Sequence, residues 1–229
     1  MPLIPLGSEK GVSPPFSWII SVPLEIIKVC GITSVADAVF AARNGATALG
    51  FIFFPGSPRY LRVEEAAMIA AAVPRGVLRV GVFVDEDPEQ IRQAVSAARL
   101  DVVQLQGNEP PSVRRDLEGL RIWKAFRVDE GFDPASVTAF ECEAYLLDTA
   151  RKGSYGGTGH TFPWRIAGET KRHGPVIIAG GLDGSNVADA IRSALPYGVD
   201  ACSKLESKPG VKDNEKVRQY LAAAQSMKE

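Results

Sequence analysis

Short runs of apolar residues recur along the chain from residue 26 onward, and polar stretches separate them. The runs are rich in Val, Ile, Leu and Phe, which favours β-strands. They are nearly continuous rather than alternating, as strands are when both faces of a sheet are covered. Eight such runs predict eight strands: IIKVC (26–30), ALGFIFF (48–54), RVGVFV (79–84), DVVQLQ (101–106), RIWKAF (121–126), AYLLD (144–148), VIIAG (176–180) and VDACS (199–203).

Helical patterns with recognisable ends lie between most of these runs. Ser34 is a typical N-cap, and Gly45 a typical end, of a helix between them. An Asp-Pro pair, which favours the start of a helix, opens 87–100 and, in shorter form, 133–140. The fourth and sixth connections have weaker helical patterns. Two further helices are predicted, over 185–195 and 213–224.

This alternation predicts an α/β fold. Eight strand–helix units fit a (β/α)8 TIM barrel, a parallel eight-stranded fold that usually takes roughly 250 residues. An open, doubly wound sheet has the same alternation, but its G-x-G-x-x-G motif does not follow the first run. We therefore expect a single barrel domain at 25–229, preceded by an N-terminal extension of unknown role at 1–24.

The charge composition restricts the classes of molecule that the chain is expected to bind. The 229 residues carry 26 basic and 27 acidic side chains, a net charge of −1, without a long run of one sign. This balance provides no field for nucleic acid or a membrane surface. The apolar stretch at 16–27 contains Pro23 and Glu25 and is too short to cross a bilayer. We expect neither partner, whereas a small anionic substrate held by local donors fits this composition.

The cysteines, Cys30, Cys142 and Cys202, are far apart in the sequence and form no C-x-x-C pair. The two histidines do not complete a metal-ligand spacing either. We therefore expect reduced thiols in a cytoplasmic protein, without a structural metal.

In a parallel barrel the chemistry lies at the carboxyl ends of the strands. The first run ends at Cys30, which is either a small buried residue or a thiolate whose pKa the following helix N-terminus lowers. The second run leads to Arg59, either a solvated side chain or a fork for a carboxylate. The sixth run ends at Asp148, either a turn cap or an acid–base group.

Glycine-rich segments follow the later runs. The loop TARKGSYGGTGHTF (149–162) is long and polar, which is typical of a mobile cover or an anion cradle. Gly180 and Gly181 end the seventh run, where backbone N–H groups can approach a ligand without a Cβ in the way. Phosphate sites in these barrels are commonly built from the loops after strands seven and eight, so we expect a phosphate group there.

Eight segments occur in order and at barrel spacing. They are KVCGIT (28–33), GFIFFPGSPR (50–59), VGVFV (80–84), VVQLQG (102–107), LLD (146–148), YGGTG (155–159), AGGLDGSNV (179–187) and GVDACSKLESKPGVKD (198–213). Together they resemble the phosphoribosylanthranilate isomerase family of tryptophan biosynthesis, from about residue 26 to the C-terminus.

The resemblance implies a (β/α)8 fold and a cofactor-free Amadori rearrangement of N-(5-phosphoribosyl)anthranilate to 1-(2-carboxyphenylamino)-1-deoxyribulose 5-phosphate. It also implies that Cys30 is the general base, Asp148 the general acid, and Arg59 the partner of the anthranilate carboxylate. A general acid at pH 7 needs a raised pKa, which partial burial of Asp148 under the glycine loop would provide. The further substrate-binding residues implied are Gln106 and Gly157 and, at the phosphate, Gly180, Gly181, Ser203 and Lys204. Both monomers and homodimers fit the resemblance.

Three positions depart from the family pattern. Gln106 stands in place of a histidine and Pro163 in place of an acid, and Cys202-Ser203-Lys204 stands in place of Ser-Ser-Gly. Lys204 is either strained, if its φ is positive, or adds a charged contact to the phosphate. These departures motivate an alternative, a barrel that binds phosphate esters with reduced or lost turnover. A related isomerase of histidine biosynthesis is a weaker alternative, because that family has aspartate where Cys30 stands.

Overall fold

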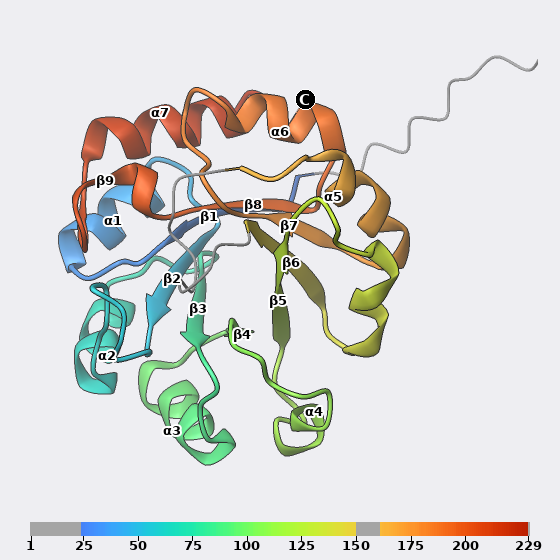
Figure 1. Cartoon of the computed structure of the whole chain (residues 1–229). Helices are drawn as coiled ribbons and strands as arrows, with labels where there is room; N and C mark the ends of the chain where they lie inside the picture. Colours follow the sequence, from blue (N-terminus) through green and yellow to red (C-terminus); the bar gives the residue numbers. More distant parts are fainter. Residues whose placement is uncertain (1–23, 150–160, 229) are drawn as a thin grey trace, which may run out of the picture.

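The computed structural model describes residues 24–149 and 161–228. Its centre is a closed barrel of eight parallel strands in chain order, in which the first strand pairs with both the second and the eighth. This closure rules out the open sheet and confirms the predicted (β/α)8 barrel (Figure 1). The strands are β1 (Ile26–Cys30), β2 (Ala48–Ile52), β3 (Leu78–Phe83), β4 (Val102–Leu105), β5 (Ile122–Val128), β6 (Ala144–Thr149), β7 (Val176–Ile178) and β8 (Gly198–Ala201).

Helices form a ring outside the barrel (Figure 1). They return the chain to the start of the next strand, which a parallel pairing requires. The α-helices are α1 (Val35–Arg43), α2 (Val63–Ala71), α3 (Pro88–Ala98), α4 (Val113–Asp116), α5 (Arg165–Thr170), α6 (Val187–Ala194) and α7 (Asn214–Gln225). Shorter described elements are the 3-10 helices η1 (Pro134–Ala139), η2 (Lys171–His173) and η3 (Ser203–Leu205) and the antiparallel pair β9 (Glu206–Lys208) and β10 (Val211–Lys212).

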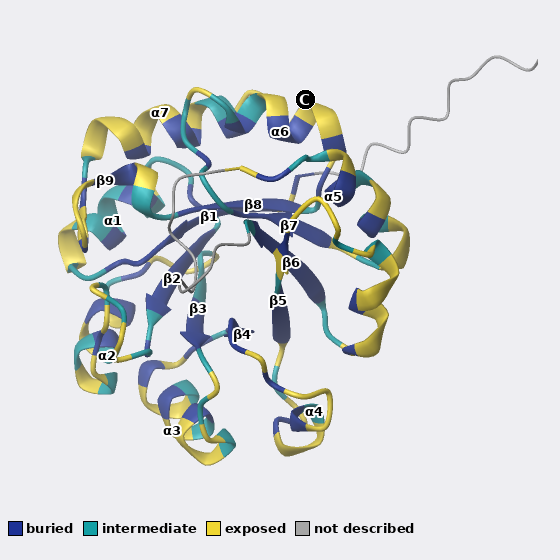
Figure 2. Cartoon of the chain, viewed as in Figure 1, coloured by how far each residue is buried: buried dark blue, intermediate teal, exposed yellow. Residues whose placement is uncertain are grey.

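The strands are buried on both faces, whereas the helices are buried only on the side that faces the strands (Figure 2). One apolar layer lies between strands and helices and includes Ile27 and Val29. A second layer fills the barrel interior and includes Ile26, Val102 and Trp123. Successive side chains of a strand point to opposite faces, so neighbouring residues of β1 belong to different layers.

The predicted helix starts are confirmed at the level of single hydrogen bonds. The Ser34 side chain accepts a hydrogen bond of 3.1 Å from the backbone N–H of Asp37, which caps α1. Asp87 accepts one of 2.8 Å from Glu89 N–H, and Pro88 is the first residue of α3. Each cap satisfies a backbone donor that the helix itself leaves unpaired.

Two parts of the connections differ from the prediction. The segment predicted as a helix over 133–140 is the 3-10 helix η1, although Asp133 caps it as expected. The sequence analysis did not name α2, whose N-cap position holds Arg62 rather than one of the usual Ser, Thr, Asp or Asn. Glu65 accepts a hydrogen bond of 2.9 Å from the Arg62 N–H and so satisfies this helix start from within the first turn.

Leu24, the last residue of the expected N-terminal extension, is buried and belongs to the layer between strands and helices. The rest of that extension, residues 1–23, lies outside the described part of the chain. Within residues 24–149 and 161–228, none of the helices is both long and apolar enough to cross a membrane.

Candidate functional site

Polar side chains face the barrel interior near the carboxyl ends of the strands. Ile26 belongs to the interior layer, so by alternation Lys28 and Cys30 face the interior too. The same step of two leads from Leu146 to Asp148 on β6. An open pocket lies at this end of the barrel, where ligand sites in this architecture are usually found. The polar side chains that line it are Cys30, Ser57, Arg59, Gln104, Gln106, Asp148, Asp200, Cys202, Ser203 and Lys204.

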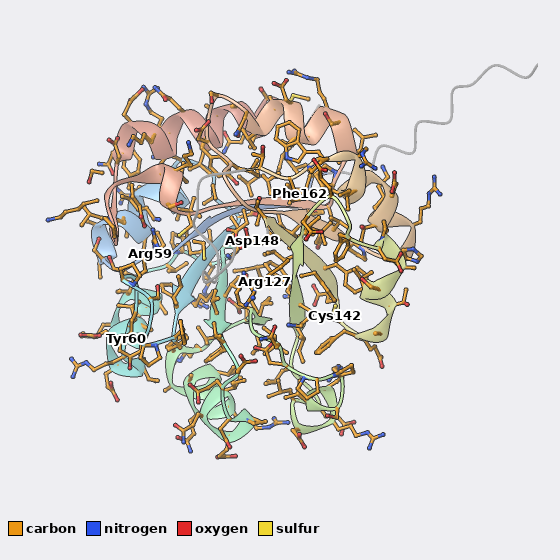
Figure 3. All side chains as sticks on the ribbon, viewed as in Figure 1. Arg59, Tyr60, Arg127, Cys142, Asp148 and Phe162 are labelled. Atoms are coloured by element: carbon orange, nitrogen blue, oxygen red, sulfur yellow. The ribbon has the colours of Figure 1, made fainter. Side chains whose placement is uncertain are left out.

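The pocket brings together the residues that the sequence analysis named. Every one of them that lies in the described part of the chain lines this pocket, including Gly180 and Gly181. Gly157 lies outside the described residues, as does most of the glycine-rich loop. Figure 3 shows Asp148 near the middle of the barrel and Arg59 to one side, nearer the ring of helices.

Cys30 lies beside a second thiol, that of Cys202. The last register pair of β1 and β8 is Val29 with Ala201, so the two cysteines follow side by side. The two thiols are electrostatically coupled, so each changes the pKa of the other. Cys30 is 5% exposed, whereas Cys202 is only partly buried.

Of the two readings of Cys30, the one with a pKa lowered by the following helix N-terminus is wrong. The hydrogen bond with Cys202, together with burial, raises the pKa of the Cys30 thiol well above its ordinary value, against the lowering effect of Lys28. The same hydrogen bond lowers the pKa of Cys202 to about 7, helped by Lys212 and Arg59. Two coupled groups lose their protons as a pair. The pair therefore loses its first proton near neutral pH, and the two sulfurs share the proton that remains.

Asp148 is 7% exposed and reaches the same pocket from β6. Burial, followed by repulsion from Asp200, raises its pKa to about 6. The Gln106 Nε2 donates a hydrogen bond of 3.1 Å to Asp148 Oδ2 and opposes this rise. Gln106 in turn accepts one of 2.6 Å from Gln104 Nε2, so its amide orientation is fixed. The expected direction of the Asp148 pKa is confirmed, with burial in the barrel as the main cause.

The sequence analysis missed an ion pair below the thiols. The Lys28 Nζ lies 2.8 Å from Asp200 Oδ2, and both side chains are buried. Burial works against the charged ammonium, but Asp200 outweighs it and raises the pKa of Lys28, which stays cationic. The other carboxylate oxygen, Asp200 Oδ1, and Gln104 Oε1 have no hydrogen-bond partner among the described residues. Both oxygens are buried, so they are unpaired acceptors inside the barrel, below the open part of the pocket.

Arg59 is held at the pocket rim by Glu206. Its Nε and Nη2 donate to the two carboxylate oxygens of Glu206 at 2.8 and 2.7 Å, a bidentate pair. The Lys212 Nζ lies 3.0 Å from the same carboxylate. Burial works against the charged form of Glu206, but the two cations hold its pKa below the ordinary value. The solvated reading of Arg59 is therefore wrong, and its Nη1 group makes no hydrogen bond to a described residue.

The turns after β7 and β8 form a further part of the pocket wall. Gly180 and Gly181 have φ angles of 82° and 67°, a left-handed conformation that favours glycine. A Cβ on Gly180 would lie 2.9 Å from Asp148 Oδ1, so this turn packs directly against the acid. Lys204 lies in the 3-10 helix η3 and is not among the positive-φ residues. The strain considered for Lys204 is therefore absent, and its exposed side chain borders the pocket without a backbone penalty.

Comparisons with known proteins agree with this geometry. A family model described as N-(5'phosphoribosyl)anthranilate (PRA) isomerase matches residues 27–223. The N-(5'-phosphoribosyl)anthranilate isomerase of Rubrobacter xylanophilus is 47% identical over 203 residues, which cover 87% of this chain and 98% of that protein.

Solved structures resemble the whole barrel. The phosphoribosyl anthranilate isomerase of Thermotoga maritima is 36% identical, with a TM-score of 0.81 over 88% of this chain and 98% of that one. Another phosphoribosyl anthranilate isomerase, in complex with reduced 1-(o-carboxyphenylamino)-1-deoxyribulose 5-phosphate, is 34% identical with a TM-score of 0.78 and the same coverage. Because both the sequence match and the barrel extend over most of the chain, this protein belongs to the N-(5'-phosphoribosyl)anthranilate isomerase family.

Proposed function

We propose that this chain converts N-(5-phosphoribosyl)anthranilate to 1-(2-carboxyphenylamino)-1-deoxyribulose 5-phosphate in tryptophan biosynthesis. The observation that carries the proposal is the meeting of Asp148 and Cys30 in one pocket, an acid with a raised pKa and a thiol pair that loses a proton near neutral pH. An Amadori rearrangement needs one proton given and one proton taken within the same substrate. These steps are acid–base steps and need no cofactor.

Asp148 supplies the first proton. It protonates the furanose ring oxygen while the C1′–O bond breaks, which leaves a hydroxyl on the sugar and a protonated imine at C1′. A carboxyl with a pKa of about 6 is partly protonated near neutral pH, whereas an ordinary aspartate is almost wholly ionised. Burial in the barrel therefore prepares Asp148 for this step.

The thiol pair takes the second proton. The imine acidifies the hydrogen on C2′, and the Cys30 sulfur removes it to give an enolamine that tautomerises to the ketose. Cys30 holds its own proton in a hydrogen bond to Cys202, so the base forms when that proton moves to the Cys202 sulfur. Positioned acid–base groups of this kind contribute roughly 10²–10⁴-fold each to the rate.

Two anchors hold the substrate between these groups. We assign the anthranilate carboxylate to the remaining donors of Arg59, whose plane Glu206 fixes. We assign the phosphate to the backbone at Gly180 and Gly181 and to Ser203, with the Lys204 ammonium as an added charge. Gln106, which donates to Asp148, and Gly157 are proposed as further substrate contacts. Anchoring at both ends turns the proton transfers into reactions between fixed neighbours.

The proposal includes one catalytic domain at 25–229, preceded by an extension at 1–24 of which Leu24 packs against the barrel, and a cytoplasmic location. A reducing compartment fits three cysteines that are all free thiols in the structure.

A coupled fluorescence assay of substrate disappearance tests the proposal. We expect turnover by the wild type, a loss of at least about a hundredfold in kcat for Cys30→Ala and for Asp148→Ala, and full activity for Cys142→Ala. Cys142 lies before β6 at the opposite end of the barrel from the pocket and serves as the matched thiol control. Equal inactivity of the wild type and both pocket variants would overturn the proposal in favour of a barrel that binds phosphate esters without turnover.

A further inference from the structure

Cys30 and Cys202 lie at neighbouring positions on two paired strands. They follow directly after Val29 and Ala201, the last register pair of β1 and β8. Neighbouring strands lie about 4.8 Å apart, within the roughly 4.4–6.8 Å that separates the Cα atoms of a disulfide. The Cys202 Sγ lies 2.9 Å from the place where a Cβ on Gly31 would stand, so this sulfur leans toward β1. The spacing of the two paired strands therefore suits a disulfide between these residues.

Cations surround the more open of the two thiols. The Lys212 Nζ lies 4.0 Å from Cys202 Sγ, and the Arg59 guanidinium acts on the same sulfur. Lys28 faces Cys30 from below, and the acids on the packed elements, Asp200 and Glu206, are each paired with a cation. Positive charge favours the thiolate, which is the form that reacts with electrophiles. The pKa of Cys202 is lowered, which also favours its thiolate.

The three cysteines differ in solvent exposure, which determines which thiol an oxidant can reach. Cys202 is partly exposed and Cys30 is almost covered, and both line the open pocket. Cys142 lies at the amino end of β6, and burial raises its pKa to about 11. A small oxidant that enters the pocket therefore meets one reactive thiolate and a second thiol on the neighbouring strand. Cys142, with its raised pKa, is the least reactive of the three thiols.

We propose that Cys30 and Cys202 are a redox modification site, a dithiol that a peroxide converts into a disulfide. The Cys202 thiolate attacks one peroxide oxygen, an S–O bond forms, the O–O bond breaks, and the leaving hydroxide takes up a proton as water. The Cys30 sulfur then attacks the sulfur of Cys202, the S–S bond forms, the S–O bond breaks, and a second water leaves with the Cys30 proton. Two thiols are oxidised, one peroxide is reduced, and a thiol reductant reverses the change.

The disulfide removes the sulfur that accepts the C2′ proton, so oxidation switches off turnover; this consequence rests on the proposed function. The covalent change itself does not. A serine in place of Cys202 is unable to form the bond, so the switch depends on the one cysteine of the Cys-Ser-Lys segment.

The experiment treats the full chain with hydrogen peroxide and follows intact mass, non-reducing peptide maps and turnover. We expect a mass decrease of two hydrogens, a crosslinked peptide pair containing Cys30 and Cys202, and at least a tenfold loss of turnover that dithiothreitol restores. Cys142→Ser should behave like the wild type in all three readouts. Cys202→Ser should give no mass decrease and no crosslink.

The outcomes separate the two proposals. An unoxidised wild type without turnover would overturn the proposed function, and the mass and peptide readouts would still decide the disulfide. A wild type that keeps its mass, gains oxygen on Cys30 without a crosslink, or crosslinks through Cys142 or between two chains would overturn the dithiol site.

Discussion

Cys30 lies among four polar groups, three of which are far from it in the sequence. Lys28 and Asp200 lie below it, and Cys202 and Arg59 flank it. The carboxylate of Asp148 has a similar dependence, since Gln106 donates to it and Asp200 repels it. Each titratable side chain of the site therefore interacts with a neighbour, and these interactions determine which group holds a proton.

Titration of the free enzyme should show two breaks. Because the acid titrates at about 6 and the thiol pair at about 7, the reactive form is a minor one. Then kcat/KM rises to about pH 6 as thiolate forms, is level to about pH 7, and falls above it as little protonated Asp148 remains. The acid break reports Asp148 and the alkaline break reports the thiol pair.

Cys202→Ser should move the alkaline break to higher pH. The serine hydroxyl does not accept the Cys30 proton, so the base becomes harder to form, and the level region of kcat/KM should fall by roughly three- to tenfold. The drop and the shift should match in size, which a purely structural defect would not produce. A lower plateau with an unmoved alkaline break would contradict the shared-proton account, and a pH series with both proteins measures it.

Glu206→Gln should weaken substrate binding more than turnover. Glu206 fixes the Arg59 fork, and that fork contacts a carboxylate remote from the reacting carbons. We expect KM to rise by roughly tenfold or more with a smaller change in kcat.

The matched control for this variant is Glu143→Gln. Glu143 makes the same bidentate pair with Arg121, at 2.8 and 2.6 Å, but at the amino ends of β5 and β6. Steady-state kinetics on folded samples, checked by circular dichroism, decide the question. A loss confined to kcat, or an equal loss in the control, would contradict the role of Glu206.

At the residue scale, the functional side chains at the ends of the strands could be predicted from the sequence. The inward-facing polar side chains earlier on the same strands were missed. Cys30 and Asp148 terminate apolar runs and were visible for that reason. Lys28 and Gln104 lie two residues before the ends of their runs and Asp200 lies three before, inside segments that read as buried strand. The period of two that places Cys30 in the pocket also places Lys28 there, and this was the signal that could have identified them. The Glu206 pairing had no local signal, because it joins the loop after β2 to β9 across 147 positions.

Among the secondary-structure elements and their turns, the turn after β7 packs directly against the proposed acid, Asp148. Gly180 needs its positive φ of 82° to bring the backbone back over β6, and its open side faces the Asp148 carboxylate. The turn that we assign to the phosphate therefore also sets the position of the acid.

Gly180→Ala should lower kcat by at least about tenfold, because small displacements of a catalytic group cost large factors in rate. The added Cβ would lie 2.3 Å from Thr149 Oγ1 and 2.9 Å from Asp148 Oδ1, so one of these residues must move. Gly119→Ala is the control, since Gly119 has a φ of 84° but nothing within 4 Å of an added Cβ. Both variants carry the same backbone strain. Kinetics and urea unfolding of the pair would refute the idea if the activities fell equally.

Elements with local signals could be predicted, and elements without them could not. All eight strands were predicted, and β1 was predicted to the residue, because buried strands read as apolar runs. The helices α1 and α3 were predicted from Ser34 and from Asp87-Pro88. The helix α2 begins without such a cap, and the hairpin of β9 and β10 has short polar strands. Burial and helix capping produce local sequence patterns, whereas contacts between residues far apart in the chain do not.

At the scale of the whole molecule, closure of the barrel brings chemistry together from both ends of the chain. The pairing of β1 with β8 places Cys30 beside Cys202 and Lys28 beside Asp200. The barrel encloses these charged groups among buried strands, and a buried ionised acid costs stability. The buried charged groups of the pocket should therefore lower the free energy of unfolding below what the apolar core alone would give.

Asp148→Asn should stabilise the fold at pH 8. The folded-state pKa of about 6 lies above the ordinary 3.8, so the folded protein binds the proton more tightly than the unfolded chain. This group therefore lowers stability as pH rises from about 4 through about 6, and the cost is complete above that range. Asparagine removes it, with a gain of up to about 3 kcal/mol at pH 8 that vanishes toward pH 4.

Urea unfolding at both pH values measures this gain. Asp189→Asn, on the exposed face of α6, should change stability little at either pH and serves as the control. A variant at position 148 that is no more stable than the wild type at pH 8 would contradict the burial cost.

The central claim is that Asp148 and the Cys30–Cys202 pair work on one substrate as acid and base, with the acid the weaker holder of its proton. The pH dependence of kcat/KM for the wild type and Asp148→Asn tests it most directly. We predict a wild-type profile that is level between about pH 6 and about 7 and falls on both sides. The variant should show a much lower profile that rises to about pH 7 and then stays level. A variant profile that keeps its alkaline fall would contradict the assignment of the acid to Asp148.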